Sequence, residues 1–128
     1  MLLNLTDLSS EPLQGQIVRQ IRAKILAGEL PAGIDLPSIR KLAREQHISV
    51  ITVQRAYESL EREGLIRSRQ RKGFFVSGLS EKAKSKMARE RLRDNLSPQI
   101  SNALAEGLSE DDVINAINLI LRKKINKR

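Results

Sequence analysis

The 128-residue chain contains no cysteine and no tryptophan. Without cysteine it forms no disulfide and offers no thiol nucleophile or thiolate metal ligand, a composition compatible with a reducing compartment. No run reaches the ~18 apolar residues of a membrane span, and the first residues lack the basic and apolar regions of a signal peptide. We therefore expect a cytoplasmic protein that does not engage a membrane.

Groups that support catalysis are also scarce. His47 is the single histidine, there is no glycine-rich phosphate loop, and no set of His or carboxylate residues has metal-ligand spacing. Asp111 and Asp112 are adjacent, but we expect them in the first turn of a helix, where carboxylates favour the helix dipole. The sequence thus argues against an enzyme, a metal site and a bound cofactor.

Basic residues exceed acidic ones, with 23 Lys and Arg against 15 Asp and Glu and a net charge of +8. This excess favours a polyanionic partner, although ribosomal and membrane-surface proteins share it. Aromatic residues are only 2% of the chain, which disfavours RNA, because RNA-binding modules stack bases on aromatic rings. The length allows one compact core with an appendage, so a separate ligand-binding domain is not expected.

The first part of the chain has the pattern of a helix-turn-helix followed by a basic hairpin. Apolar residues recur every four positions over residues 11–27, and shorter helical patterns cover residues 38–46 and 49–64. His47 lies in the turn between the latter two, where a left-handed residue is needed and histidine is tolerated. Residues 65–69 and 73–77 favour two strands. We predict a mainly α fold with a small β-hairpin wing, a winged helix-turn-helix domain over residues 1–78.

Residues 79–128 are predicted to form a two-helix C-terminal dimerisation tail. Pro98 falls inside the first helix and predicts a kink or a break near residues 96–98. Ser109, with Asp112 three residues later, predicts an acidic capping box for the last helix. The tail is too small to bury its own apolar stripes, so we predict a homodimer. The stripe residues are Leu92, Leu96, Ile100, Leu104, Val113, Ile114, Ile117, Ile120 and Leu121.

The helix over residues 49–64 is the candidate for reading double-stranded DNA. A rotation of 100° per residue places Ile51, Gln54 and Arg55 opposite its core face. Gln suits adenine and Arg suits guanine, while an exposed Ile suits thymine methyl groups, which predicts a half-site containing A·T pairs. A solvated surface is the alternative for Gln54 and Arg55.

Other side chains are candidates for the phosphate backbone. The Ser49 and Thr52 hydroxyls lie near a helix N-terminus, where they suit phosphate, although for Ser49 plain capping is an equal alternative. The wing residues Arg69, Arg71 and Lys72 suit phosphates or the minor groove.

Several short motifs in this sequence together resemble one family. They are Pro12-Leu13, Gln16-Ile17, Leu36-Pro37-Ser38-x-Arg40-x-Leu42-Ala43, Ile48-Ser49-x-x-Thr52-Val53-x-x-Ala56-Tyr57 and Glu63-Gly64-Leu65-Ile66. Together they resemble the GntR family of bacterial winged-helix repressors, and the short tail resembles its YtrA-type branch. The resemblance implies a transcriptional regulator that binds an inverted-repeat operator as a homodimer. It places Ser38, Arg40 and Gly73 at DNA-binding positions.

The sequence departs from the family pattern on the surface that reads DNA. Val50 replaces a frequent Arg or polar residue, Ile51 replaces a small polar one, and Arg71 stands where the first wing glycine is usual. The fold is therefore expected to transfer, whereas the operator sequence is not. A winged-helix module that binds protein instead of DNA is the alternative, which the basic wing disfavours. The sequence leaves open a small-molecule effector of unknown identity.

Overall fold

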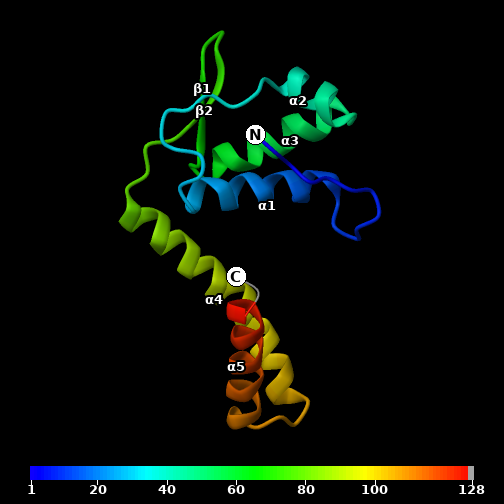
Figure 1. The fold of residues 1–128 in the computed structure, drawn as a ribbon, viewed down its shortest axis with the longest axis vertical. Coiled ribbons are helices and arrows are strands. Elements are labelled where there is room, and N and C mark those ends of the chain that lie inside the picture. Colours follow the sequence, from blue (N-terminus) through cyan, green and yellow to red (C-terminus); the bar gives the residue numbers. More distant parts are fainter. Residues whose placement is uncertain (127–128) are drawn as a thin grey trace. The chain divides into compact units, whose positions relative to one another are not determined.

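The computed structural model describes residues 1–126, which form elements in the order α1, α2, α3, β1, β2, α4, α5 (Figure 1). The chain divides into two compact units, Met1–Ser85 and Lys86–Arg128. This division falls inside α4 (Glu81–Ala105), whereas the domain boundary expected from the sequence precedes that helix. Residues 127 and 128 of the predicted tail lie outside the described residues.

Helix α1 (Leu13–Leu26) supplies one wall of the core of the first unit. Its residues Ile17, Ile21 and Ile25 are fully buried, because a spacing of four keeps them on one face of the helix. This face packs against α3 (Figure 1). The helix ends at Leu26, and Gly28, directly after the capping residue Ala27, has a φ of 84°, the left-handed conformation that commonly follows a helix end.

Two serine-capped helices follow, α2 (Ile39–Gln46) and α3 (Val50–Arg62). The Ser38 side chain accepts a hydrogen bond from the Lys41 amide, and the Ser49 side chain accepts one from the Thr52 amide, both at 3.1 Å. Between the helices, His47 has φ 55° and ψ 44°. The predicted left-handed turn at this histidine is therefore confirmed.

The inner face of α3 completes the core. Val53, Ala56, Tyr57 and Leu60 are fully buried, as the helical spacing predicts. The Tyr57 hydroxyl donates a hydrogen bond of 2.7 Å to the Pro37 carbonyl, and the ring meets Phe74 edge to face at 5.1 Å. Burial raises the pKa of the Tyr57 hydroxyl above its usual value. Tyr57 therefore connects α3 both to the segment that precedes α2, through Pro37, and to the β-hairpin, through Phe74.

The wing is the antiparallel pair β1 (Ile66–Arg69) and β2 (Gly73–Val76), with Ile66 opposite Val76 and Arg69 opposite Gly73. A third segment, expected from the sequence to be a loop, lies along the other edge of β2. The Leu36 amide donates to the Phe74 carbonyl and the Val76 amide donates to the Ile34 carbonyl, each at 2.9 Å. Strand β2 is therefore paired on both edges.

The N-terminal segment is held against α1 by two glutamine side chains. Gln16, which is 2% exposed, accepts from the Thr6 amide and donates to the carbonyls of Thr6 and Glu11. Gln20 in the same way accepts from the Asn4 amide and donates to the Asn4 carbonyl. Leu3, next to Asn4, is buried. This segment is thus part of the first unit's fold.

In the second unit, α4 continues through Pro98 as one helix, so of the predicted kink or break, the break is wrong. Pro98 and the residue four positions earlier, Asp94, are exposed, and water can therefore solvate the carbonyl that proline leaves without a donor. Helix α5 (Glu110–Asn126) begins with the predicted capping box. Ser109 and Asp112 exchange hydrogen bonds of 2.9 and 3.1 Å, and the shorter one, from the Ser109 amide to the Asp112 carboxylate, holds the pKa of Asp112 below its usual value. The predicted fold class is confirmed.

Candidate nucleic-acid interface

The outward face of α3 carries side chains that the core does not explain. Val50 and Ile51 are 47% and 48% exposed at its first turn, and Gln54 and Arg55 are exposed one turn later. Ile51, Gln54 and Arg55 lie on the side of α3 that faces away from the buried residues described above, whereas Val50, seven residues before Tyr57, is exposed because it begins the helix. Apolar exposure at a helix start is therefore combined here with two groups that can read base edges.

The hydroxyls of Ser49 and Thr52 form a pair at the start of this face. Their oxygens lie 2.7 Å apart, and the Ser49 oxygen also accepts the Thr52 amide hydrogen. Capping of α3 by Ser49 is therefore established. One hydroxyl hydrogen lies between the two oxygens, which leaves the other hydroxyl hydrogen of the pair available to a phosphate at the helix N-terminus.

Gln54 has a neighbour that the sequence reading did not single out. Its amide nitrogen donates to the Glu58 carboxylate at 3.2 Å, one turn further along α3. A spacing of four places such residues side by side on a helix surface, and this was the signal available in the sequence. The bond leaves the Gln54 carbonyl oxygen and its second amide hydrogen, which are the groups a bidentate contact to adenine requires.

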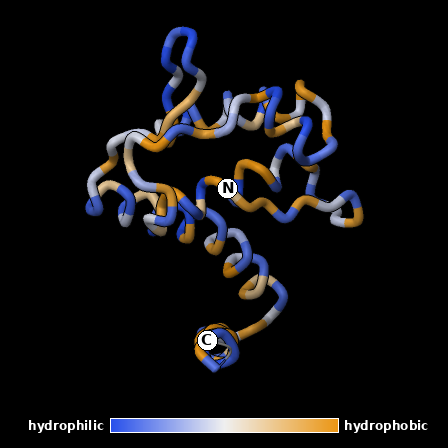
Figure 2. The backbone as a smooth tube through the Cα atoms, turned by 45° about the horizontal axis from the view of Figure 1, so that its top comes forward, coloured by the Kyte–Doolittle hydropathy of each residue, from blue (hydrophilic) through white to orange (hydrophobic). Residues whose placement is uncertain are grey.

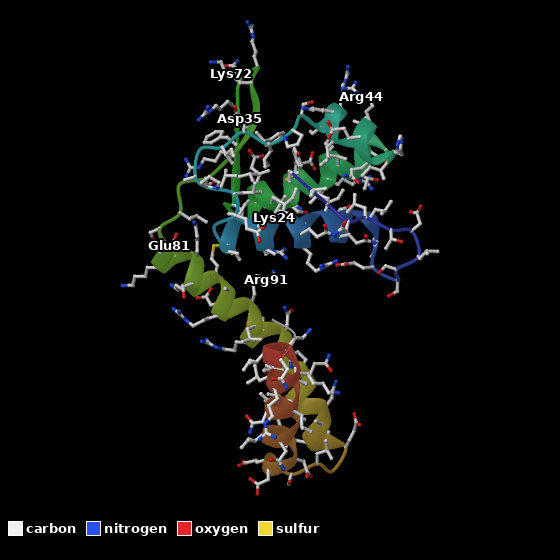
Figure 3. The ribbon with its side chains drawn as sticks, in the orientation of Figure 1. Lys24, Asp35, Arg44, Lys72, Glu81 and Arg91 are labelled. Carbon is white, nitrogen blue, oxygen red and sulfur yellow. The ribbon has the colours of Figure 1, made fainter. Side chains whose placement is uncertain are left out.

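Helix α2 contributes its N-terminal turn and its outer face. Ser38 serves as the N-cap, and its oxygen accepts the Lys41 amide hydrogen. Arg40 is exposed in the first turn, and Arg44 is exposed one turn later (Figure 3). Arg44 was not among the predicted site residues, although its spacing of four from Arg40 places both on one side of the helix.

The wing ends in a basic turn. Arg69, Arg71 and Lys72 are exposed, and Figure 2 shows this turn as the hydrophilic end of the hairpin. Lys72 extends from it (Figure 3). Arg71 has φ 65° and Gly73 has φ 81°, so Arg71 adopts the left-handed conformation that glycine would adopt with less strain. The turn keeps its backbone shape without the usual first glycine and carries a charge there.

Asp35 adds a carboxylate to this otherwise basic wing and was not predicted. Its Oδ1 lies 3.9 Å from Nη1 of Arg69, whose guanidinium carbon lies 4.0 Å from the centre of the Phe75 ring. Figure 3 shows Asp35 beside the hairpin. Arg69 is therefore held by two neighbours and is not a freely moving side chain.

The described part of the chain shows neither a metal site nor a helix that could span a membrane. Residues 1–126 hold no cluster of three or more His, Cys, Asp or Glu side chains able to bind a metal ion. Within the same residues, no helix combines the length and the apolar character needed to cross a bilayer.

Comparison with known proteins identifies this arrangement. The sequence model for bacterial regulatory proteins of the gntR family matches residues 13–76, which contain α1, α2, α3 and both strands. The chain belongs to this family. It is accordingly a winged helix-turn-helix DNA-binding transcriptional regulator, and membership disfavours a module that binds only protein.

Individual relatives extend the match. The uncharacterized HTH-type transcriptional regulator YhcF of Bacillus subtilis is 35% identical over 85 residues, covering 64% of this chain and 70% of YhcF. The HTH-type transcriptional repressor YtrA of the same organism is 39% identical over 69 residues, covering 54% of this chain and 53% of YtrA. The solved structure of YtrA from Sulfolobus acidocaldarius, a GntR-family transcription factor, aligns with a TM-score of 0.64 at 31% identity, covering 82% of this chain and 99% of that one.

Proposed function

We propose that the chain is a cytoplasmic, non-enzymatic repressor that binds an inverted-repeat operator as a homodimer. The observation that carries the DNA-binding part is the combination, within one unit, of an exposed reading face on α3 and an exposed basic wing. The repressor assignment is supported by the similarity to YtrA of B. subtilis. A small-molecule effector is left open, because no residue set identifies its site.

In this proposal base contacts come from the outward face of α3. Gln54 and Arg55 offer paired hydrogen-bonding groups, and Ile51 and Val50 offer apolar contact to thymine methyl groups. Since Val50 and Ile51 depart from the family pattern described above, we expect the operator sequence of this chain to differ from those of its relatives.

Contacts to phosphates are assigned to the surrounding polar groups. The Ser49–Thr52 pair and the N-terminal turn of α2, with Ser38 and Arg40, present hydroxyl and guanidinium donors. On the wing, the corresponding groups are Arg69, Arg71, Lys72 and the backbone at Gly73. These contacts fix the orientation of the protein on DNA, and they make the affinity strongly dependent on salt.

Self-association is supported by the apolar surface of the second unit. Helix α5 has no buried residue, and the second unit exposes many large apolar side chains. Of the predicted dimerisation residues, five are exposed: Leu92, Leu104, Ile114, Ile120 and Leu121. The other four, Leu96, Ile100, Val113 and Ile117, are half-buried. Leu108, Leu119 and Ile125 are exposed as well and were not among the predicted residues, and Leu119 lies on the side of α5 opposite the predicted stripe.

The charges of α5 support pairing with a second copy of itself. Its first turn is acidic, with Glu110, Asp111 and Asp112, and its last turn is basic, with Lys123 and Lys124. In an antiparallel pair related by a two-fold axis, each acidic end meets the basic end of the partner helix. The two winged units of such a dimer would occupy half-sites about 34 Å apart, or multiples of that distance, which requires an inverted repeat.

The decisive experiment selects bound sequences from random double-stranded DNA at two salt concentrations. We expect an inverted repeat with A·T pairs in each half-site and an affinity that falls steeply with salt. Selection of a single, unrepeated site would contradict the dimer, and failure to enrich any sequence would contradict specific binding.

The dimer has its own test in Ile114→Glu, which places a charge on the apolar surface at a position that is already half exposed. The matched control is Asn115→Glu, which adds the same charge at the adjacent exposed position. Sedimentation should show a dimer for the wild type and the control and a monomer for Ile114→Glu. A dimer in all three would remove α5 from the interface.

A further inference from the structure

The outward face of the wing is built so that an acidic side chain reaches a basic one. In the register of the hairpin, Arg67 lies opposite Phe75, and Arg69 lies one diagonal step away on the same face. Asp35 is bridged to Phe75 from the other edge of β2, which puts its side chain on this face too. Asp35, Phe75 and Arg69 therefore form a row across three adjacent segments.

The contacts within this row explain how Arg69 is held. Its guanidinium covers the Phe75 ring at 4.0 Å and reaches across it to the Asp35 carboxylate at 3.9 Å. Stacking occupies a flat face of the guanidinium and leaves its in-plane N–H groups directed outward. Both charged groups stay accessible, with side-chain exposures of 47% for Arg69 and 72% for Asp35.

Asp35 is fixed in place by its backbone. Its neighbours Ile34 and Leu36 are hydrogen-bonded to β2, with the Ile34 carbonyl accepting from Val76 and the Leu36 amide donating to Phe74. The carboxylate therefore stays on the wing whatever binds there. A carboxylate presents oxygens to a guanidinium much as a phosphate does, and both accept paired hydrogen bonds from arginine.

We propose that Asp35 is an internal competitor for DNA phosphate, which holds Arg69 in the unbound protein and must be released when Arg69 turns to the backbone of DNA. The inference rests on the proposed DNA-binding function. Because phosphates are the same in every sequence, the competition lowers affinity for operator and non-specific DNA alike. Asp35 thus lowers the sequence-independent part of the binding free energy. Base contacts then contribute a larger share of the total binding free energy.

The test measures the affinity of full-length Asp35→Asn for a mixed-sequence duplex at several salt concentrations. An exposed ion pair is weak, so we expect binding about two- to five-fold tighter than that of the wild type. The slope of log K against log salt should become steeper by a fraction of the ~0.9 that one phosphate contact contributes. The control is Glu29→Gln, which removes the same charge from an exposed carboxylate beside Lys24 and should leave binding within two-fold of the wild type.

A second background separates competition from plain repulsion of DNA. In Arg69→Gln, the change Asp35→Asn should give no further gain, because the group for which Asp35 competes is absent. An equal gain in both backgrounds, unchanged binding of Asp35→Asn, or weaker binding would each overturn the inference. A wild type that binds no DNA would instead refute the proposed function, so the two failures are distinguishable.

Discussion

Ile51 offers the sharpest test of how this regulator reads sequence. The substitution Ile51→Ser removes an apolar side chain from the first turn of α3 and restores a small polar residue there. Since Ile51 is 48% exposed and lies outside the core, the change should leave the thermal stability of the winged unit nearly unaltered. Its effect should fall on binding.

The magnitude follows from the exposure. Burying a whole isoleucine side chain gains roughly 1.5 to 3 kcal/mol, so covering the exposed half against DNA gains about 1 kcal/mol, or about five-fold in affinity, per protomer. A dimer that uses both copies would lose about 2 kcal/mol, or about thirty-fold, on Ile51→Ser. This loss is large enough to measure and far smaller than the loss expected from unfolding.

The assay replaces thymine by uracil at single positions of the selected operator, which removes the methyl group and keeps base pairing intact. Wild-type affinity should fall at one or two positions in each half-site, and Ile51→Ser should be insensitive at those same positions. If every position responds equally, or if the serine variant keeps its sensitivity to uracil, Ile51 does not contact thymine methyl groups.

Three further substitutions test other parts of the structure. Arg71→Gly should raise the free energy of unfolding by up to about 1 kcal/mol, because glycine adopts the left-handed conformation of residue 71 with less strain. The loss of one charge should also reduce the slope of log K against log salt for DNA binding by about 0.9. Thermal melts and salt titrations measure the two effects, and a lower melting temperature would contradict the assigned turn. Tyr57→Phe should cost about 1 kcal/mol at neutral pH, because the Pro37 carbonyl loses its donor. Because burial raises the pKa of Tyr57, the unfolded chain loses this proton before the folded one as the pH rises past 10.0. The stability of the wild type should therefore fall above that pH, and the stability of Tyr57→Phe should fall less. Parallel pH profiles would contradict burial of the hydroxyl. Gln16→Ala should destabilise the protein by roughly 1 to 3 kcal/mol, because it leaves backbone groups of Thr6 and Glu11 unpaired. Chemical denaturation measures this loss, and Gln14→Ala is the control, for which we expect a smaller one. Equal effects would refute the role of Gln16 in holding the N-terminal segment.

Local patterns explain why much of this fold could be predicted from the sequence. The buried faces of α1 and α3 follow from apolar spacing, and the Ser49 cap and the His47 turn follow from residue types with strong local preferences. The exposure of Ile51 was predictable for the same reason, since its place on α3 is set by helix geometry.

Features formed between distant segments could not be predicted in this way. Asp35 meets Arg69 only because residues 34–36 pair with β2, and Arg22 meets Glu63 through two hydrogen bonds of 2.9 Å between residues 41 positions apart. Charged residues at such separations carry no mark of their partner in the sequence. The continuity of α4 at Pro98 likewise depends on solvent around the helix and not on proline alone.

The hydrogen bonds of Gln16 and Gln20 fix the position of the first residues of the chain along α1. Two residues of extended chain, from Asn4 to Thr6, advance about 6.6 Å, and four residues of helix, from Gln16 to Gln20, advance about 6 Å. Because these two lengths match, the two side-chain amides can bind the segment in only one register. A shift by one residue would turn the Leu3 side chain from the protein interior to the solvent. Deleting a single residue between Leu3 and Thr6 should therefore disturb the winged unit more than adding residues before Met1.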